Sequence, residues 1–136
     1  MWRVRPSLTA IACATGVVAL VSGWAATMAY SSRKQTDRVA RAMTAGDPDR
    51  APTLLRRYGC SGCHTIPGIP GADGQVGVSL ADIRKRVYVG GAATNSAENL
   101  VRWIVLPQSF SPASAMPTTG ISESEARDVA AYLYSR

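Results

Sequence analysis

A five-residue motif, Cys60-Ser61-Gly62-Cys63-His64, restricts the possible folds of this chain more than any other feature. Two thiols three positions apart, followed at once by an imidazole, are typical of covalent haem attachment. On a single helical turn the two sulfurs reach the two vinyl groups of one porphyrin, and the adjacent His64 becomes an axial iron ligand. The motif therefore predicts one haem c, bound through Cys60 and Cys63, with a domain folded around it.

Two other uses of a C-x-x-C pair compete with this interpretation. A redox dithiol is expected between a strand and a helix, but no strand-like alternation flanks Cys60. A zinc site requires four ligands, and they are lacking because His64 is the only histidine and Cys13 lies in an apolar stretch. The attached His64 favours haem over both alternatives.

Met116 is the candidate for the second axial ligand. Of the four methionines, Met1 and Met28 are in the N-terminal segment and Met43 precedes the motif. Only Met116 follows it, in a loop rich in proline and serine, and a thioether ligand favours ferrous iron and raises the reduction potential. The competing interpretation is a methionine that fills a gap in the core.

Residues 47–136 resemble a class I cytochrome c, and this resemblance rests on several short runs. They are Tyr58 to Gly68 around the haem motif, Asn95 to Trp103, Pro107-Gln108, Met116-Pro117 and Ala130 to Leu133. More narrowly, these runs are similar to the cytochrome modules that accompany bacterial haem-copper oxidases. The resemblance implies an all-α fold around one covalent haem ligated by His64 and Met116.

The resemblance also suggests further haem contacts. Arg86 falls where the family places an arginine near a haem propionate, although a solvated basic surface is an equal alternative. Tyr88 and Trp103 carry O–H and N–H donors that can reach propionates, and Trp103 can equally pack against the haem. Val78 stands where the family usually has a proline whose carbonyl accepts a hydrogen bond from the ligand histidine.

Basic charge gathers beside an apolar segment. The net charge is +6, and +5 of it comes from the residues that flank this segment: Arg3, Arg5, Arg33, Lys34, Arg38 and Arg41 against Asp37. The remaining sequence is almost neutral, which argues against nucleic-acid binding and favours contact with anionic lipid.

The apolar segment itself, Leu8 to Tyr30, contains no charged residue. A transmembrane helix needs about 20 apolar residues, so this segment is long enough to span a bilayer. A cleaved signal peptide with a site at Thr27-Met28-Ala29 is the alternative, but the run is long for one. We expect residues 1–30 to be the anchor, 31–46 a polar helical linker and 47–136 the cytochrome domain.

Topology signals conflict. Positive residues are more numerous after the span than before it, which alone keeps the C-terminal part in the cytoplasm. Cytochromes of the resembled family receive their haem outside the cytoplasmic membrane. We therefore expect a single-pass protein of the bacterial inner membrane with its haem domain in the periplasm.

Capping signals divide the domain into short helices. Pro52 opens one before the motif, Ser79 with Asp82 predicts a brief helix to Arg86, and Asn95 with Glu98 predicts one ending before Pro107. Ser122 with Glu125 starts the last helix. The resemblance implies that its apolar face crosses the helix before the motif at Ala51 and Leu55.

Function follows from the predicted haem ligands. With both axial positions filled no substrate reaches the metal, so the chain is expected to be an electron carrier and not an enzyme. Its partner would be a redox protein such as a terminal oxidase or a quinol-oxidising complex. A gas sensor or peroxidase-like enzyme with an open distal site, and a structural oxidase subunit with an idle haem, are the alternatives.

Overall fold

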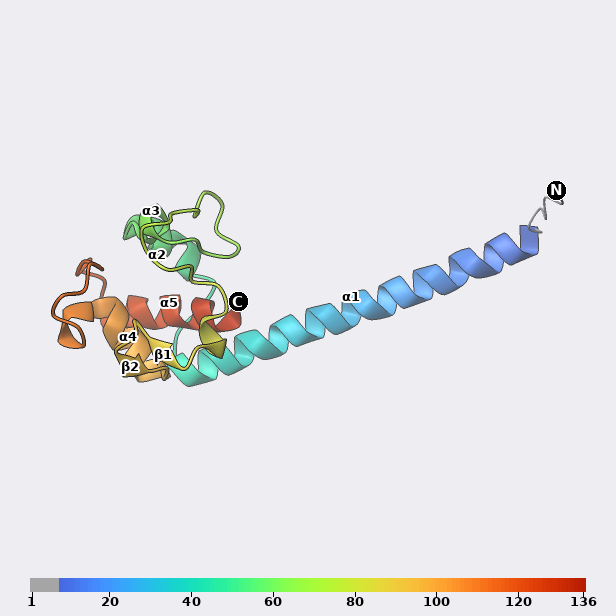
Figure 1. Cartoon of the computed structure of the whole chain (residues 1–136). Helices are drawn as coiled ribbons and strands as arrows, with labels where there is room; N and C mark the ends of the chain where they lie inside the picture. Colours follow the sequence, from blue (N-terminus) through green and yellow to red (C-terminus); the bar gives the residue numbers. More distant parts are fainter. Residues whose placement is uncertain (1–7) are drawn as a thin grey trace. The chain divides into compact units, whose positions relative to one another are not determined.

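A computed structural model describes residues 8–136, and its internal contacts divide the chain into two units at Gln35 and Thr36. The first helix, α1 (Leu8–Thr44), runs through this boundary without interruption (Figure 1). It can do so because no proline occurs between its ends. Arg3 and Arg5, which we expected before the span, lie outside the described residues.

The first unit is an apolar helix that is long enough to cross a membrane. Within the described residues, this helix is Cys13–Thr44. Its most apolar part has a mean hydropathy of 1.4 and contains no buried residue. Large side chains such as Leu20 and Trp24 are exposed along it. The predicted apolar N-terminal helix is confirmed, and length and composition are the basis of its assignment as a membrane anchor.

The second unit, Thr36–Arg136, contains the remaining elements. These are α2 (Ala51–Arg57), α3 (Cys60–Cys63), a 3-10 turn η1 (Ile83–Lys85), strands β1 (Tyr88–Val89) and β2 (Ala93–Thr94), α4 (Ala97–Val105), a 3-10 turn η2 (Pro107–Ser109) and α5 (Glu123–Ser135). Both α2 and α4 pack against α5, and in Figure 1 α2 and α3 lie above α5 while α4 lies below it. The all-α prediction is confirmed, since the described residues are mostly helical.

The helix before the motif meets the last helix as expected. Ala51 and Leu55 on α2 are completely buried, as is Ala130 on α5. Small side chains at a crossing let two helix backbones approach closely, while Leu55 fills the space beside them. The predicted contact between α2 and α5 is confirmed.

Helix caps agree with the sequence in one case and differ in two. Ser122 and Glu125 form the predicted capping box of α5. The cap of α4 is Ser96, not Asn95, since the Ser96 hydroxyl accepts from the Asn99 N–H. The helix predicted from Ser79 is wrong: Asp82 adopts a left-handed backbone conformation and only the 3-10 turn η1 follows it.

A small antiparallel hairpin was not predicted. Tyr88 of β1 pairs with Thr94 of β2, and Val89 pairs with Ala93. Gly90 and Gly91 turn the chain with positive φ angles, and a side-chain carbon at Gly90 would lie 2.2 Å from the Trp103 ring. Glycine is required at this position both for its backbone angle and for the close approach of Trp103.

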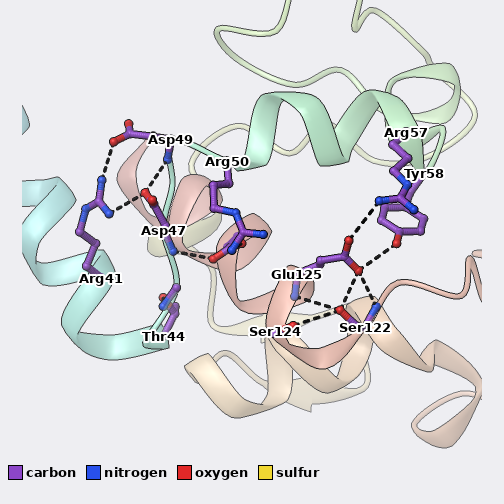
Figure 2. A network of polar contacts seen from close by, with 12 residues as sticks. Arg41, Thr44, Asp47, Asp49, Arg50, Arg57, Tyr58, Ser122, Ser124 and Glu125 are labelled. Carbon is purple, nitrogen blue, oxygen red and sulfur yellow. Dashed lines mark hydrogen bonds and ion pairs between the residues drawn. The ribbon is translucent and has the colours of Figure 1, made fainter.

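The end of α1 belongs to the second unit. Ala40 and Thr44 are buried, and the Arg127 guanidinium donates to the Thr44 carbonyl at 3.1 Å. Arg41 forms ion pairs with Asp47 and Asp49, drawn in Figure 2. The predicted linker, residues 31–46, is therefore helical up to Thr44, and its second part packs into the domain.

Candidate functional site

The haem motif occupies a single turn of helix. Cys60 and Cys63 begin and end α3, so their side chains project to one side of the turn. Gly59 precedes it with φ 72°, a left-handed conformation that glycine adopts without strain. Both cysteines are free thiols. Burial raises the pKa of the Cys60 thiol, and the nearby Cys63 adds to the effect.

His64 leaves the helix in an extended conformation and is fixed by the following loop. Its Nδ1 lies 2.6 Å from the Val78 carbonyl oxygen. Because a carbonyl can only accept, Nδ1 carries a proton, which leaves Nε2 as the nitrogen that can coordinate a metal. Gly77 lies against the ring, and a side-chain carbon there would lie 2.3 Å from His64 Cε1. The loop thus sets both the orientation and the tautomer of the imidazole.

A cavity of about 380 Å³ opens beside the motif, which is within the usual range for a small-molecule or cofactor site. Cys60, His64 and Met116 all line it. Its walls are otherwise largely apolar and come from every helix of the domain core: Leu55, Leu80, Ile83, Leu100, Ile104, Val129 and Leu133. A smaller hollow of about 120 Å³ adds Cys63 and shares Cys60, His64 and Met116 with the larger one.

Met116 is held in the loop between η2 and α5. Its N–H donates to the Ser114 hydroxyl at 3.3 Å, and its carbonyl accepts from the Gln108 side chain at 2.8 Å. The structure thus brings a thioether to the same cavity as His64, although the two residues are far apart in the sequence.

Arg86, Tyr88 and Trp103 also line the larger cavity. The Arg86 guanidinium donates to the carbonyls of Ser79 and Ala81. Tyr88 is 59% exposed on strand β1, whereas Trp103 is partly buried and its ring centroid lies 6.2 Å from that of Phe110. The structure therefore brings Cys60, His64, Met116 and these three residues to one cavity, and Cys63 to the adjoining hollow.

Asn95, in the same cavity wall, was missed as a site residue by sequence reasoning. Its amide donates to the carbonyls of Ile83 and Arg86 at 2.7 and 2.9 Å, and its oxygen accepts from Tyr134 at 2.7 Å. The adjacent helix start made Asn95 look like a cap. Its actual role is to join α5 to the segment that carries Arg86.

A second polar cluster supports the approach to the motif. Glu125 at the start of α5 accepts from the Tyr58 hydroxyl at 2.9 Å and lies 3.5 Å from Arg57, as drawn in Figure 2. Hydrogen bonds from Ser122 and then Tyr58 lower the pKa of Glu125. The carboxylate therefore joins the end of α2, directly before Cys60, to the last helix.

A family model described as cytochrome c matches residues 48–136, which include the motif, Met116 and every helix that lines the cavity. The chain belongs to the cytochrome c family. Members of this family carry covalent haem c, so this cytochrome is an electron carrier. The apolar helix α1 precedes its haem-binding domain and fits a membrane anchor.

A curated relative gives a narrower comparison. The cytochrome is 34% identical over 83 residues to a protein named cytochrome c oxidase subunit 2 from Alkalihalophilus pseudofirmus. The matched region covers 60% of this chain but only 23% of that protein, so the chain corresponds to about a quarter of the relative's length. A comparison with solved structures found no significant match to the chain.

The residues of this cytochrome fit a covalent haem. Its thiols are one helical turn apart and not bonded to one another. An imidazole fixed through its Nδ1, a thioether and a largely apolar wall line the same cavity. Thiols, imidazole and thioether are the side chains that attach and ligate haem c.

Proposed function

We propose that this protein is a membrane-tethered c-type cytochrome that carries single electrons in a respiratory chain, to or within a terminal haem-copper oxidase complex. The observation that carries the proposal is that Cys60, His64 and Met116 line one cavity. A histidine and a methionine as the two axial ligands leave no position for a substrate. This arrangement suits electron transfer and opposes the sensor and peroxidase-like alternatives.

Each predicted residue has a defined task in this proposal. Cys60 and Cys63 would hold the haem through their sulfur atoms, and His64 and Met116 would coordinate its iron. Bound haem supplies a one-electron couple between ferrous and ferric iron. The Val78 carbonyl holds His64 by its Nδ1–H, which raises the basicity of the coordinating nitrogen.

Arg86, Tyr88 and Trp103 are proposed to bind the haem propionates. All three residues line the same cavity. One guanidinium nitrogen of Arg86 donates to the carbonyls of Ser79 and Ala81, which fixes the side chain. A guanidinium has further N–H donors, and these suit a carboxylate.

The partner and the location are supported by the relative and by the apolar helix. The relative's name, cytochrome c oxidase subunit 2, favours a terminal oxidase as the electron acceptor over a quinol-oxidising complex. We place residues 1–30 in the bacterial inner membrane as a single-pass anchor, followed by the linker 31–46. The domain 47–136 then lies on the periplasmic side, where tethering raises its effective concentration near the acceptor.

Absorption spectra of the purified protein test the ligation. We expect a ferrous spectrum typical of haem held by two thioethers, and a weak ferric charge-transfer band from the iron–methionine bond. Ready binding of carbon monoxide by the ferrous protein at neutral pH would refute filled histidine and methionine ligation. A c-type spectrum without the methionine band would remove Met116 as a ligand and favour the sensor or enzyme.

Electron-transfer kinetics test the partner. The reduced full-length protein, reconstituted in vesicles with a purified haem-copper oxidase, should be oxidised in the presence of oxygen and should support turnover. No electron exchange in this system would contradict the oxidase assignment and favour an idle haem or another acceptor.

Protease digestion of intact spheroplasts tests the topology, because a periplasmic domain is cleaved and a cytoplasmic one is protected.

A further inference from the structure

Gln108 makes two hydrogen bonds to the loop that carries Met116. Its amide nitrogen donates to the Met116 carbonyl, and its amide oxygen accepts from the Thr118 hydroxyl, each at 2.8 Å. The Met116 carbonyl can only accept, so the nitrogen end of the amide must face it and the oxygen end faces Thr118. One side chain therefore hydrogen-bonds to the loop on both sides of Pro117.

Gln108 can act as a fixed point because its own backbone is anchored to the core. It lies in the 3-10 turn η2, next to Pro107, which is fully buried. The Leu106 N–H donates to the Arg102 carbonyl at 2.8 Å, and the Phe110 N–H to the Pro107 carbonyl at 3.1 Å. These bonds continue helix α4 into the turn, so the Gln108 side chain projects from a rigid element to a loop.

A loop methionine needs such support to remain a ligand. A loop without regular structure samples many conformations, and each one that withdraws the thioether opens the sixth coordination position. The Met116 N–H makes a longer bond, to the Ser114 hydroxyl at 3.3 Å. The half-buried Gln108 amide favours the one loop conformation in which Met116 faces the cavity.

We propose that Gln108 is a positioning residue that keeps Met116 in place as the second axial ligand. The proposal rests on the proposed function, in which Met116 fills that role. Gln108 does not itself line either cavity, so it acts through the loop and not through contact with the haem.

Imidazole binding to the ferric full-length holoprotein tests this proposal, since imidazole must displace the thioether. Its apparent affinity depends on the fraction of molecules in which Met116 has dissociated. Gln108→Leu removes both hydrogen bonds at similar volume, and we expect about tenfold tighter imidazole binding with a weaker methionine charge-transfer band. Gln108→Glu keeps the acceptor for Thr118 but loses the donor to Met116, and should behave similarly.

Two controls separate positioning from general stability. Thr118→Val removes only the bond between Thr118 and Gln108. Because Thr118 is exposed, we expect this variant to fold even if the Gln108 variants do not. It should tighten imidazole binding by a smaller factor than they do. Gln35→Leu removes an exposed amide on α1 and should leave the affinity unchanged. A purely structural role for Gln108 would lower the denaturation midpoint but leave imidazole affinity at the wild-type value.

The outcomes also distinguish this proposal from the proposed function. If the wild type shows the methionine band and all variants bind imidazole within about twofold of it, Gln108 has no positioning role, although Met116 remains a ligand. If the wild type lacks the band, Met116 is not a ligand and both proposals fail.

Discussion

At the scale of single residues, Met116 decides between an electron carrier and an open-site haem protein. In Met116→Ala we expect the haem to remain attached, because Cys60, Cys63 and His64 are untouched. The methionine charge-transfer band should disappear and the ferrous protein should bind carbon monoxide. The reduction potential should fall, since a thioether ligand favours ferrous iron.

Met43→Ala is the matched control for this change. Met43 is 49% exposed on α1, so its loss should leave the spectra and the potential unchanged. An open distal site would give the opposite pattern, in which wild type and Met116→Ala bind carbon monoxide equally well.

Gly77 is the residue on which the orientation of His64 depends most directly. In Gly77→Ala the new carbon would overlap the imidazole, which cannot yield because the Val78 carbonyl holds its Nδ1. We expect the free energy of unfolding to fall by about 1–3 kcal/mol, the usual cost of overpacking, and holoprotein yield to fall with it. Urea denaturation and haem content measure these effects.

Gly62 provides the matched comparison within the haem motif. A side-chain carbon there meets nothing within 4 Å, and its φ angle is not in the left-handed region. Gly62→Ala should therefore retain wild-type stability and haem content. Equal effects of the two substitutions would contradict the packing of Gly77 against His64.

At the scale of elements, Tyr134 joins α5 to the cavity wall through Asn95 and makes this contact sensitive to pH. Burial, and then the charge of Glu98, raise the pKa of Tyr134 to about 12. Since the unfolded side chain titrates near pH 10, the native state holds its proton more tightly. This stabilisation is complete below about pH 10 and is lost as the pH rises toward 12.

Tyr134→Phe should remove that part of the pH dependence. The difference in unfolding free energy between wild type and variant should shrink from pH 9 to about pH 12, as followed by urea denaturation at each pH. The variant also leaves the Asn95 oxygen without its donor, so it should be less stable at neutral pH by about 1 kcal/mol. A difference that is constant with pH would contradict the raised pKa.

Sequence patterns predicted an element correctly where residues of the same turn form it. They failed where a residue distant in the sequence determines the local structure. The capping box of Ser122 and Glu125 needs only residues of the same turn, and it was predicted correctly. Asn95 and Ser96 are both good caps, and Asn95 was the wrong choice because Tyr134 and the Arg86 segment engage its side chain. The hairpin β1–β2 has strands too short to show an alternating pattern.

The candidate site shows the same division. The haem motif and Met116 were predicted as site residues from residue type and spacing, and the structure brings Cys60, His64 and Met116 to one cavity. The contact of Gln108 with the Met116 loop has no sequence signature, because an amide and a loop carbonyl can meet at almost any spacing. The packing of Gly77 on His64 likewise depends on how the loop returns to the motif.

At the scale of the whole molecule, the junction between α1 and the domain is held by close backbone packing and by bonds to a buried carboxylate. Gly46 lies directly against the backbone of Arg127, where a side-chain carbon would lie 2.1 Å from the carbonyl oxygen. The Asp47 N–H donates to the buried Asp128 carboxylate at 2.7 Å, and Arg50 pairs with the other oxygen of that carboxylate at 3.1 Å. Hydrogen bonds to a buried carboxylate stabilise more than exposed ion pairs do.

This junction predicts that a cytochrome domain beginning at residue 47 is incomplete. A truncated chain that begins at Thr36 keeps the buried Ala40 and Thr44 and the Arg41 ion pairs, whereas one that begins at Asp47 loses them. Exposing the core that Ala40 and Thr44 cover, and removing the Thr44 carbonyl that accepts from Arg127, should cost about 2–4 kcal/mol of unfolding free energy. Urea denaturation of the two holoproteins measures the difference, with haem spectra to show that both ligands remain. Equal stability of the two would place the boundary at residue 47 and leave the end of α1 as a spacer.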